Sequence, residues 1–372
     1  MRARLETFPA PAPADTLAAR LRHRPGFAYL RTGQFDVASA RHSLLAADPV
    51  LVFRSLGAHG EIHLGGRREA IFGDPWRILG RLLGEFEQPD EADAPFPLGA
   101  AIGYWGYELR QFLEPRVGRR AVHDLAIPDC QVGFHGSLAV YDHQHDAITV
   151  VATGVGSDGR RTERRQEQQL RAWRQRLFAP PGPPDPRAAP PHPGRLAAVS
   201  LGREDFLARV RQAQQYIRQG DIYQVNLAQR LQLDGIPPAW ELFQRWCARS
   251  PAPFGLFLDA GDFALLSASP ELFLRLSGTH ALTRPIKGTR PRSPDPARDA
   301  QLTGELRRSE KEMAELVMIT DLLRNDLGRI SEFGSVRVPE LVRLERFAHV
   351  QHLVSTIEGR LRPEISHLDA LA

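Results

Sequence analysis

The sequence has few of the features that cross-link, anchor or export a protein. Its 372 residues contain only two cysteines, Cys130 and Cys247, too few for a disulfide framework and not at metal-ligand spacing. Arg, Glu, Pro and Asp interrupt the first thirty residues, and no later segment reaches the roughly 18 apolar residues of a membrane span. We therefore expect a cytoplasmic protein with no membrane partner.

Lysine is also scarce. Of 48 basic residues, only Lys287 and Lys311 are lysines, and 44 acidic residues leave a net charge of +4. The densest basic segment, Arg160–Arg176, has seven arginines but almost no interleaved aromatic residues. This pattern fits a solvated helix face better than a nucleic-acid site, so we expect no nucleic-acid partner. In such an arginine-rich chain, each retained lysine is a candidate functional residue.

The composition that remains is that of a globular protein, with 42% hydrophobic and 25% charged residues. Eight prolines between Pro180 and Pro193 favour an extended linker. The sequence thus predicts an amino-terminal region at 1–178, a linker at 179–199 and a second region at 200–372.

Short alternating runs predict antiparallel strands at Leu98–Tyr107 and Ser137–Tyr141. After the linker, an apolar stripe predicts a helix over Glu204–Gln219, ended by Gly220. Strict alternation then predicts one strand over Tyr223–Leu233, whose polar face fits solvent better than a cavity lining.

Two hairpins follow. The first joins Phe254–Asp259 to Phe263–Ser267, and the second joins Leu272–Leu276 to Ala281–Ile286. A three- or four-residue loop in the second hairpin brings Glu271 and Lys287 close together at its open end. A cross-strand salt bridge is the simpler interpretation. The flanking Pro270, Pro285 and Gly288-Thr289 instead favour positioned functional side chains.

A long helix is predicted over Gln301–Leu327, with Gly328 as its end. The apolar run Leu316–Ile319 indicates that this part is buried, which would bury the neighbouring Glu315. A buried carboxylate needs a counter-ion, either an arginine or a divalent cation.

His352 lies in a predicted final strand, Val350–Glu358, where a lone histidine is more often structural than catalytic. Ser366 to Asp369 resembles a capping box, but one helical turn before Ala372 is too short to be stable alone. We therefore expect the Val350–Glu358 strand to have an uncovered edge.

Seven segments resemble, in family order, the chorismate-utilising enzymes. They read SARHSLLAADP from Ser39, LGAAIGYWGYELR from Leu98, GDIYQVNLAQR from Gly220, SASPELFLR from Ser267, TRPIKGTR from Thr283, MAELVMITDLLRNDLGR from Met313 and HVQHLVSTIEG from His349. The resemblance covers almost the whole chain. It implies an α+β fold of two large packed antiparallel sheets with helices outside.

The resemblance also implies roles for individual residues. Lysine in the PIKGT motif marks aminodeoxychorismate synthase, so Lys287 would attack C2 of chorismate while Glu271 protonates the departing C4 hydroxyl. Glu315 matches a glutamate that holds Mg²⁺. His352 matches a substrate-contacting histidine, and Gly288 and Thr289 belong to the substrate loop.

Other family features set the alternatives. Gln224 stands where water-adding members have a lysine base, which argues against isochorismate synthesis. Ammonia is expected from a separate glutamine amidotransferase subunit. The family's glycine-rich final segment is not found before Ala372, so a truncated, non-catalytic remnant is one alternative and anthranilate synthase component I another. Tyr29–Thr32 departs from the family's tryptophan-binding segment.

Overall fold

The computed structural model describes residues 1–33, 41–87, 94–119, 121–180 and 194–372. The chain divides into two compact units, one formed by Met1–Pro181 with Trp246–Ala372 and the other by Gly182–Arg245. Most of the proline-rich segment, and Ser39 and Ala40 of the first family-like segment, lie outside the described residues. The domain boundaries drawn from the sequence stay a prediction.

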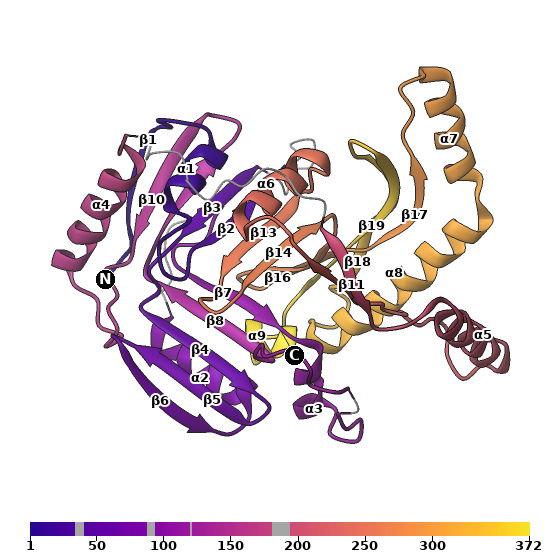
Figure 1. The fold of residues 1–372 in the computed structure, drawn as a ribbon, viewed down its shortest axis with the longest axis horizontal. Helices are drawn as coiled ribbons and strands as arrows, with labels where there is room; N and C mark the ends of the chain where they lie inside the picture. Colours follow the sequence, from indigo (N-terminus) through magenta and orange to yellow (C-terminus); the bar gives the residue numbers. More distant parts are fainter. Residues whose placement is uncertain (34–40, 88–93, 120, 181–193) are drawn as a thin grey trace. The chain divides into compact units, whose positions relative to one another are not determined.

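Three antiparallel sheets form the framework of the larger unit (Figure 1). The seven-stranded sheet has the order β1 (Arg4–Pro9), β10 (Ala147–Ala152), β9 (Ser137–Asp142), β3 (His42–Ala46), β2 (Ala28–Arg31), β13 (Phe254–Asp259) and β14 (Ala264–Ser269). The amino-terminal five-stranded sheet has the order β6 (Arg67–Phe72), β5 (His59–Leu64), β4 (Leu51–Leu56), β8 (Cys130–His135) and β7 (Ala100–Trp105).

The third, carboxyl-terminal sheet is organised around one long strand, β19 (Val350–Arg360). Its neighbours are β16 (His280–Arg284) and β17 (Ile286–Pro291) along one edge and β18 (Arg337–Arg346) along the other, with β15 (Leu272–Ser277) outside β16. The expected uncovered edge is therefore wrong, because both edges of β19 are paired.

Helices cover these sheets because each presents an apolar stripe. On α2 (Pro75–Phe86), Ile78, Leu79 and Leu82 join the core of the amino-terminal sheet. On α4 (Glu163–Leu177), Leu170 and Trp173 are buried. The remaining helices of this unit are α1 (Ala14–Leu21), η1 (Tyr107–Leu109), α3 (Arg110–Leu113), α7 (Pro296–Arg308), α8 (Glu310–Ile330) and α9 (His367–Leu371).

Among the residues that the structure describes, four arginines of α4 form ion pairs, and three of these pairs reach residues outside the helix. Arg174 lies 2.7 Å from Glu6, Arg176 lies 2.7 Å from Asp48, and Arg165 lies 3.0 Å from Asp158. The basic segment therefore packs one face on the core and anchors the other through ion pairs. No helix in the described part of the chain is long and apolar enough to cross a membrane.

The smaller unit contains α5 (Arg203–Gln219) and the strand pair β11 (Arg195–Val199) and β12 (Leu231–Asp234); α6 (Ala239–Arg249) begins in it. Gly220 ends α5 in a left-handed conformation, as the sequence predicts. The predicted strand Tyr223–Leu233 is wrong before Leu231. The pairing with β11 ends at Arg230, whose carbonyl accepts a 2.9 Å hydrogen bond from the Ser200 N–H. Because a strand needs a partner along its length, the residues before Arg230 do not form one.

The predicted helix 301–327 is also wrong in its continuity and its end. Ser309 is extended and separates α7 from α8, and its hydroxyl accepts a hydrogen bond from the backbone N–H of Glu312. The helix α8 then continues past Gly328 to Ile330. The α+β prediction itself, with large packed antiparallel sheets and helices outside, is confirmed.

Candidate functional site

Five of the six candidate residues lie on the carboxyl-terminal sheet or just before its first strand, and the sixth lies on α8. Lys287, Gly288 and Thr289 belong to β17, His352 to β19 and Glu271 to the turn before β15. Glu315 is on α8, which packs on β17 and β19.

A β-bulge at Gly288 shapes the centre of the site. Lys287 pairs with Leu353 and Thr289 with His352, so Gly288 is the extra residue on β17. Its φ of +74° favours glycine, and a Cβ there would lie 3.0 Å from the Glu312 and Leu306 side chains. Glycine thus lets the first turn of α8 approach the bulge closely.

His352 is held by two groups of this bulge. Its Nδ1 lies 3.0 Å from the Thr289 hydroxyl and 3.3 Å from the Gly288 carbonyl. Because a carbonyl can only accept, Nδ1 carries the hydrogen in that contact and Nε2 keeps a lone pair. Burial lowers the pKa of His352, an effect that the Gly288 carbonyl and the carboxylates of Glu271 and Glu345 oppose. The ring is therefore a neutral hydrogen-bond acceptor at Nε2.

The second hairpin turns more tightly than expected. Ser277 pairs with His280, so the loop has two residues, and neither the three-residue nor the four-residue expectation is correct. Glu271 nevertheless reaches β17, where its Oε1 accepts a 2.8 Å hydrogen bond from the N–H of Ile286, the residue before Lys287. The Glu271 side chain is exposed.

Lys287 is partly buried on β17. Its ammonium makes no hydrogen bond or ion pair with any residue that the structure describes, Glu271 included. The simpler interpretation, a cross-strand salt bridge, is therefore wrong for this pair. A partly buried amine without a counter-ion is available to a ligand.

Glu315 differs from expectation. Its side chain is 36% exposed and lies 3.8 Å from the Lys311 ammonium, one turn earlier on α8. Leu316 is buried, but Val317 is 43% exposed, so the apolar run does not bury all sides of the helix. The predicted burial of Glu315 is wrong, because only one face of α8 packs on the sheet. Of the two counter-ions considered, the described residues place no arginine beside Glu315, and the divalent cation stays a prediction.

The residues around Glu315 determine how a metal could bind. Among the described residues there is no group of three or more His, Cys, Asp or Glu side chains able to hold a metal ion. One partly exposed carboxylate fits the way Mg²⁺ is often held, through one or two carboxylates together with substrate oxygens and water.

A buried ion pair that was not among the predicted site residues lies beside them. Arg284 on β16 donates to Glu345 on β18, and the two side chains are only 13% and 9% exposed. Glu345 is the β18 partner of His352 in the strand register, so it flanks the histidine opposite Thr289. The sequence does indicate a strand here with charged residues on one face, because Arg343 and Glu345 alternate with Val342 and Leu344.

The site thus combines an amine without a counter-ion, a carboxylate fixed by a backbone amide, a neutral imidazole and a carboxylate on an adjacent helix. These groups suit nucleophilic and acid–base chemistry on a small polar substrate.

Comparison with known proteins identifies the family. The model of the chorismate binding enzyme family matches residues 46–372. The chain belongs to this family. Membership indicates an enzyme that acts on chorismate.

Individual relatives agree with the family match. Aminodeoxychorismate synthase component 1 of Escherichia coli is 32% identical over 365 residues, which cover 96% of this chain and 75% of the relative. Anthranilate synthase component 1 of Thermus thermophilus is 40% identical over 302 residues, covering 80% of this chain and 63% of the relative.

The fold agrees as well. The crystal structure of anthranilate synthase component I from Streptococcus pneumoniae superimposes with a TM-score of 0.76 at 28% identity, over 91% of this chain and 73% of that one.

Proposed function

We propose that this family member is component 1 of an aminodeoxychorismate synthase. It would convert chorismate to 4-amino-4-deoxychorismate, with ammonia supplied by a glutamine amidotransferase subunit. The proposal rests mainly on the environment of Lys287. This lysine is partly buried and has no counter-ion among the described residues, which suits a nucleophile.

In the proposed reaction, the neutral Lys287 amine attacks C2 of chorismate as the C4 hydroxyl departs as water, giving a lysine-bound intermediate. Glu271 would donate the proton that the leaving hydroxyl needs. Its Oε1 is held by the Ile286 N–H, which fixes the position of the carboxyl group beside β17. Ammonia then attacks C4, the ring double bonds shift back and the Lys287 amine leaves C2, which gives 4-amino-4-deoxychorismate.

The remaining residues would bind rather than react. His352, with its Nε2 lone pair, would accept a hydrogen bond from a substrate hydroxyl, and Thr289 holds the ring in place. Glu315 would hold Mg²⁺, which supplies positive charge for a substrate carboxylate.

Anthranilate synthesis is the second candidate, favoured by the 40% identity to the Thermus thermophilus enzyme and by the structural match. Overall identity does not separate the two activities, since relatives of both kinds are similar at 32–40%.

Product analysis separates them. The protein is incubated with chorismate, Mg²⁺ and ammonium, and the products are identified by chromatography and mass spectrometry. We expect aminodeoxychorismate, and we expect Lys287→Ala to lower its formation by at least about 100-fold. The chain's other lysine gives the comparison: Lys311 is 78% exposed and pairs with Glu315, so Lys311→Ala should shift the Mg²⁺ requirement but lower product formation at saturating Mg²⁺ far less than Lys287→Ala. Anthranilate as the main product would support the second candidate.

A further inference from the structure

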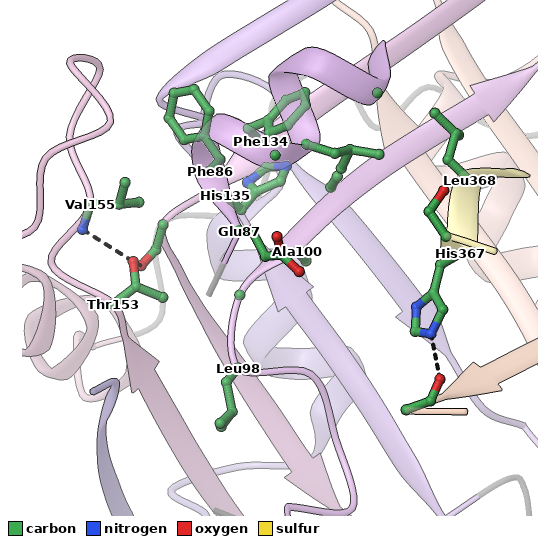
Figure 2. A pocket seen from close by; sticks show the side chains of 18 of the residues that line it. Phe86, Glu87, Leu98, Ala100, Phe134, His135, Thr153, Val155, His367 and Leu368 are labelled. Atoms are coloured by element: carbon green, nitrogen blue, oxygen red, sulfur yellow. Dashed lines mark hydrogen bonds between the residues drawn. The ribbon is translucent and has the colours of Figure 1, made fainter. Parts of the chain in front are cut away.

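A cleft of about 660 Å³ lies apart from the candidate site, and none of the six candidate residues lines it. It is bounded by α2, the start of β7, the end of β8 and the segment 361–368 (Figure 2). Apolar side chains form most of its wall, among them Leu83, Phe86, Leu98, Phe134, Val155, Ile365 and Leu368. Its volume is within the range of about 300–1,000 Å³ that is typical of small-molecule sites.

One polar side chain in this wall is unsatisfied. His135 lies beside Phe86 and Phe134 (Figure 2) and is only 4% exposed. Its Nδ1 has no hydrogen-bond partner among the described residues. A buried polar atom without a partner costs about 1–3 kcal/mol, so a ligand that satisfies it gains affinity.

The chemistry of His135 limits what such a ligand is. Burial lowers the pKa of His135 to about 4, although the Ala47 backbone and Asp48 act in the opposite direction. The ring is therefore neutral near pH 7. The hydrogen bond with the Ala47 backbone raises the pKa of His135, so its acceptor is the Ala47 carbonyl and its donor is a protonated ring nitrogen. Because Nδ1 makes no such bond, the donor is Nε2, and Nδ1 of the neutral ring is an acceptor.

Two glycines of α2 keep the cleft open. Gly80 and Gly84 are one helical turn apart, and both line the cleft. Among the described residues, a Cβ on Gly84 would meet no atom within 4 Å, and one on Gly80 would first meet Leu368 at 3.5 Å. Each glycine costs about 1 kcal/mol of helix stability relative to alanine, yet neither is required by a positive φ or by close packing. Their effect is to leave space that a larger side chain would fill.

The two arginines of the wall have partners inside the protein, and the third charged residue, Glu87, is exposed. Arg161 donates to the carbonyls of Phe86 and Glu87, at 2.9 and 2.6 Å, where α2 ends. Arg362 donates to the Arg329 carbonyl at 2.7 Å. The wall is thus mainly apolar, and the hydroxyls of Thr153 and Ser366 and the ring of His367 bond within the protein, which leaves the buried His135 as the unsatisfied neutral acceptor among the described residues.

We propose that this cleft binds a neutral aromatic compound of about two rings that carries one N–H or O–H donor. The rings would pack on Phe86 and Phe134, and the donor would bond to Nδ1 of His135. The proposal does not depend on the catalytic activity.

The probe for the test is N-phenyl-1-naphthylamine, a neutral compound of two aromatic groups, naphthyl and phenyl, joined by a single N–H, which fluoresces in apolar surroundings. We expect saturable binding to the protein, and Gly84→Leu should weaken it about tenfold by filling the space. Gly118→Leu is the matched control, because Gly118 also has an ordinary φ and open space but lies outside the cleft. Absence of saturable binding, or equal weakening by both variants, would overturn the proposal.

The role of His135 is tested with the N-methylated probe, which lacks the donor. Native protein should prefer the N–H probe by roughly tenfold, the value of one hydrogen bond, and His135→Phe should remove the preference. Thermal melts check that His135→Phe folds. If it does not, the probe pair on the native protein decides, since equal affinity for both probes contradicts the proposed donor.

Discussion

Replacing Gly288 with alanine should destabilise the protein through two separate effects. At a φ of +74°, an L-residue costs roughly 1–2 kcal/mol. The new Cβ would also lie 3.0 Å from the side chains of Glu312 and Leu306, and such overpacking costs about 1–3 kcal/mol. The free energy of unfolding should therefore fall by about 2–5 kcal/mol.

Gly278→Ala separates the two effects. Gly278 is in the hairpin loop between β15 and β16 with a φ of +56°, but a Cβ there meets no atom of the described residues within 4 Å, so only the backbone cost applies. Urea unfolding followed by circular dichroism gives both values, provided that the m-values agree. Equal losses for Gly288→Ala and Gly278→Ala would refute the close approach of α8 to the bulge.

The same substitution should impair activity beyond its effect on stability. Relief of the contact moves β17 relative to α8 and displaces Lys287 and Thr289 from His352. A displacement of about 1 Å near reacting groups can cost about 100-fold in rate. Measured at a temperature where the variant is folded, kcat should fall by about that factor, whereas native kcat would argue that the bulge does not position the site.

Three further predictions concern charged and titratable groups. The pKa of His135 is lowered by burial from its unfolded value of about 6.5 to about 4, so its contribution to stability is complete above about pH 6.5 and is lost as the pH falls toward about 4. Urea unfolding should show that the free energy of unfolding falls by about 2–3 kcal/mol between about pH 7 and 4.5, and that His135→Phe removes this loss. An unchanged loss in His135→Phe would contradict the assignment. Glu345→Ala leaves Arg284 buried without its partner and should cost about 3–5 kcal/mol in the same assay, whereas a loss under about 1 kcal/mol would mean that the pair is solvated. Glu315→Gln removes only an exposed pair with Lys311, so the melting curve should hardly change while the Mg²⁺ concentration for half-maximal activity rises; the reverse pattern would make Glu315 structural.

Local patterns predicted the elements whose interactions are close in sequence. Gly220 ends α5 because it supplies the left-handed conformation by itself, and the first hairpin closes as its alternation indicates. The break at Ser309 was also readable, since Ser309 followed by Glu312 is a capping pattern, but apolar periodicity on both sides concealed it.

Tertiary packing decided what the sequence did not. The burial of Glu315 depended on which face of α8 meets the sheet, and His352 acquires its partners through the bulge at Gly288. The ion pair between Arg284 and Glu345 joins strands 61 residues apart, a distance at which strand alternation carries no pairing information. Candidate residues were thus recognisable by type and motif, while their partners required the fold.

The central claim, that Lys287 is a nucleophile, is tested most directly by mass spectrometry of the protein after incubation with chorismate and Mg²⁺ without ammonia. We expect the peptide containing Lys287 to gain the mass of chorismate less one water. Ammonium should remove this modification, and the peptide containing Lys311 should stay unmodified. Full aminodeoxychorismate formation by Lys287→Ala, with no modified peptide in the native protein, would contradict it.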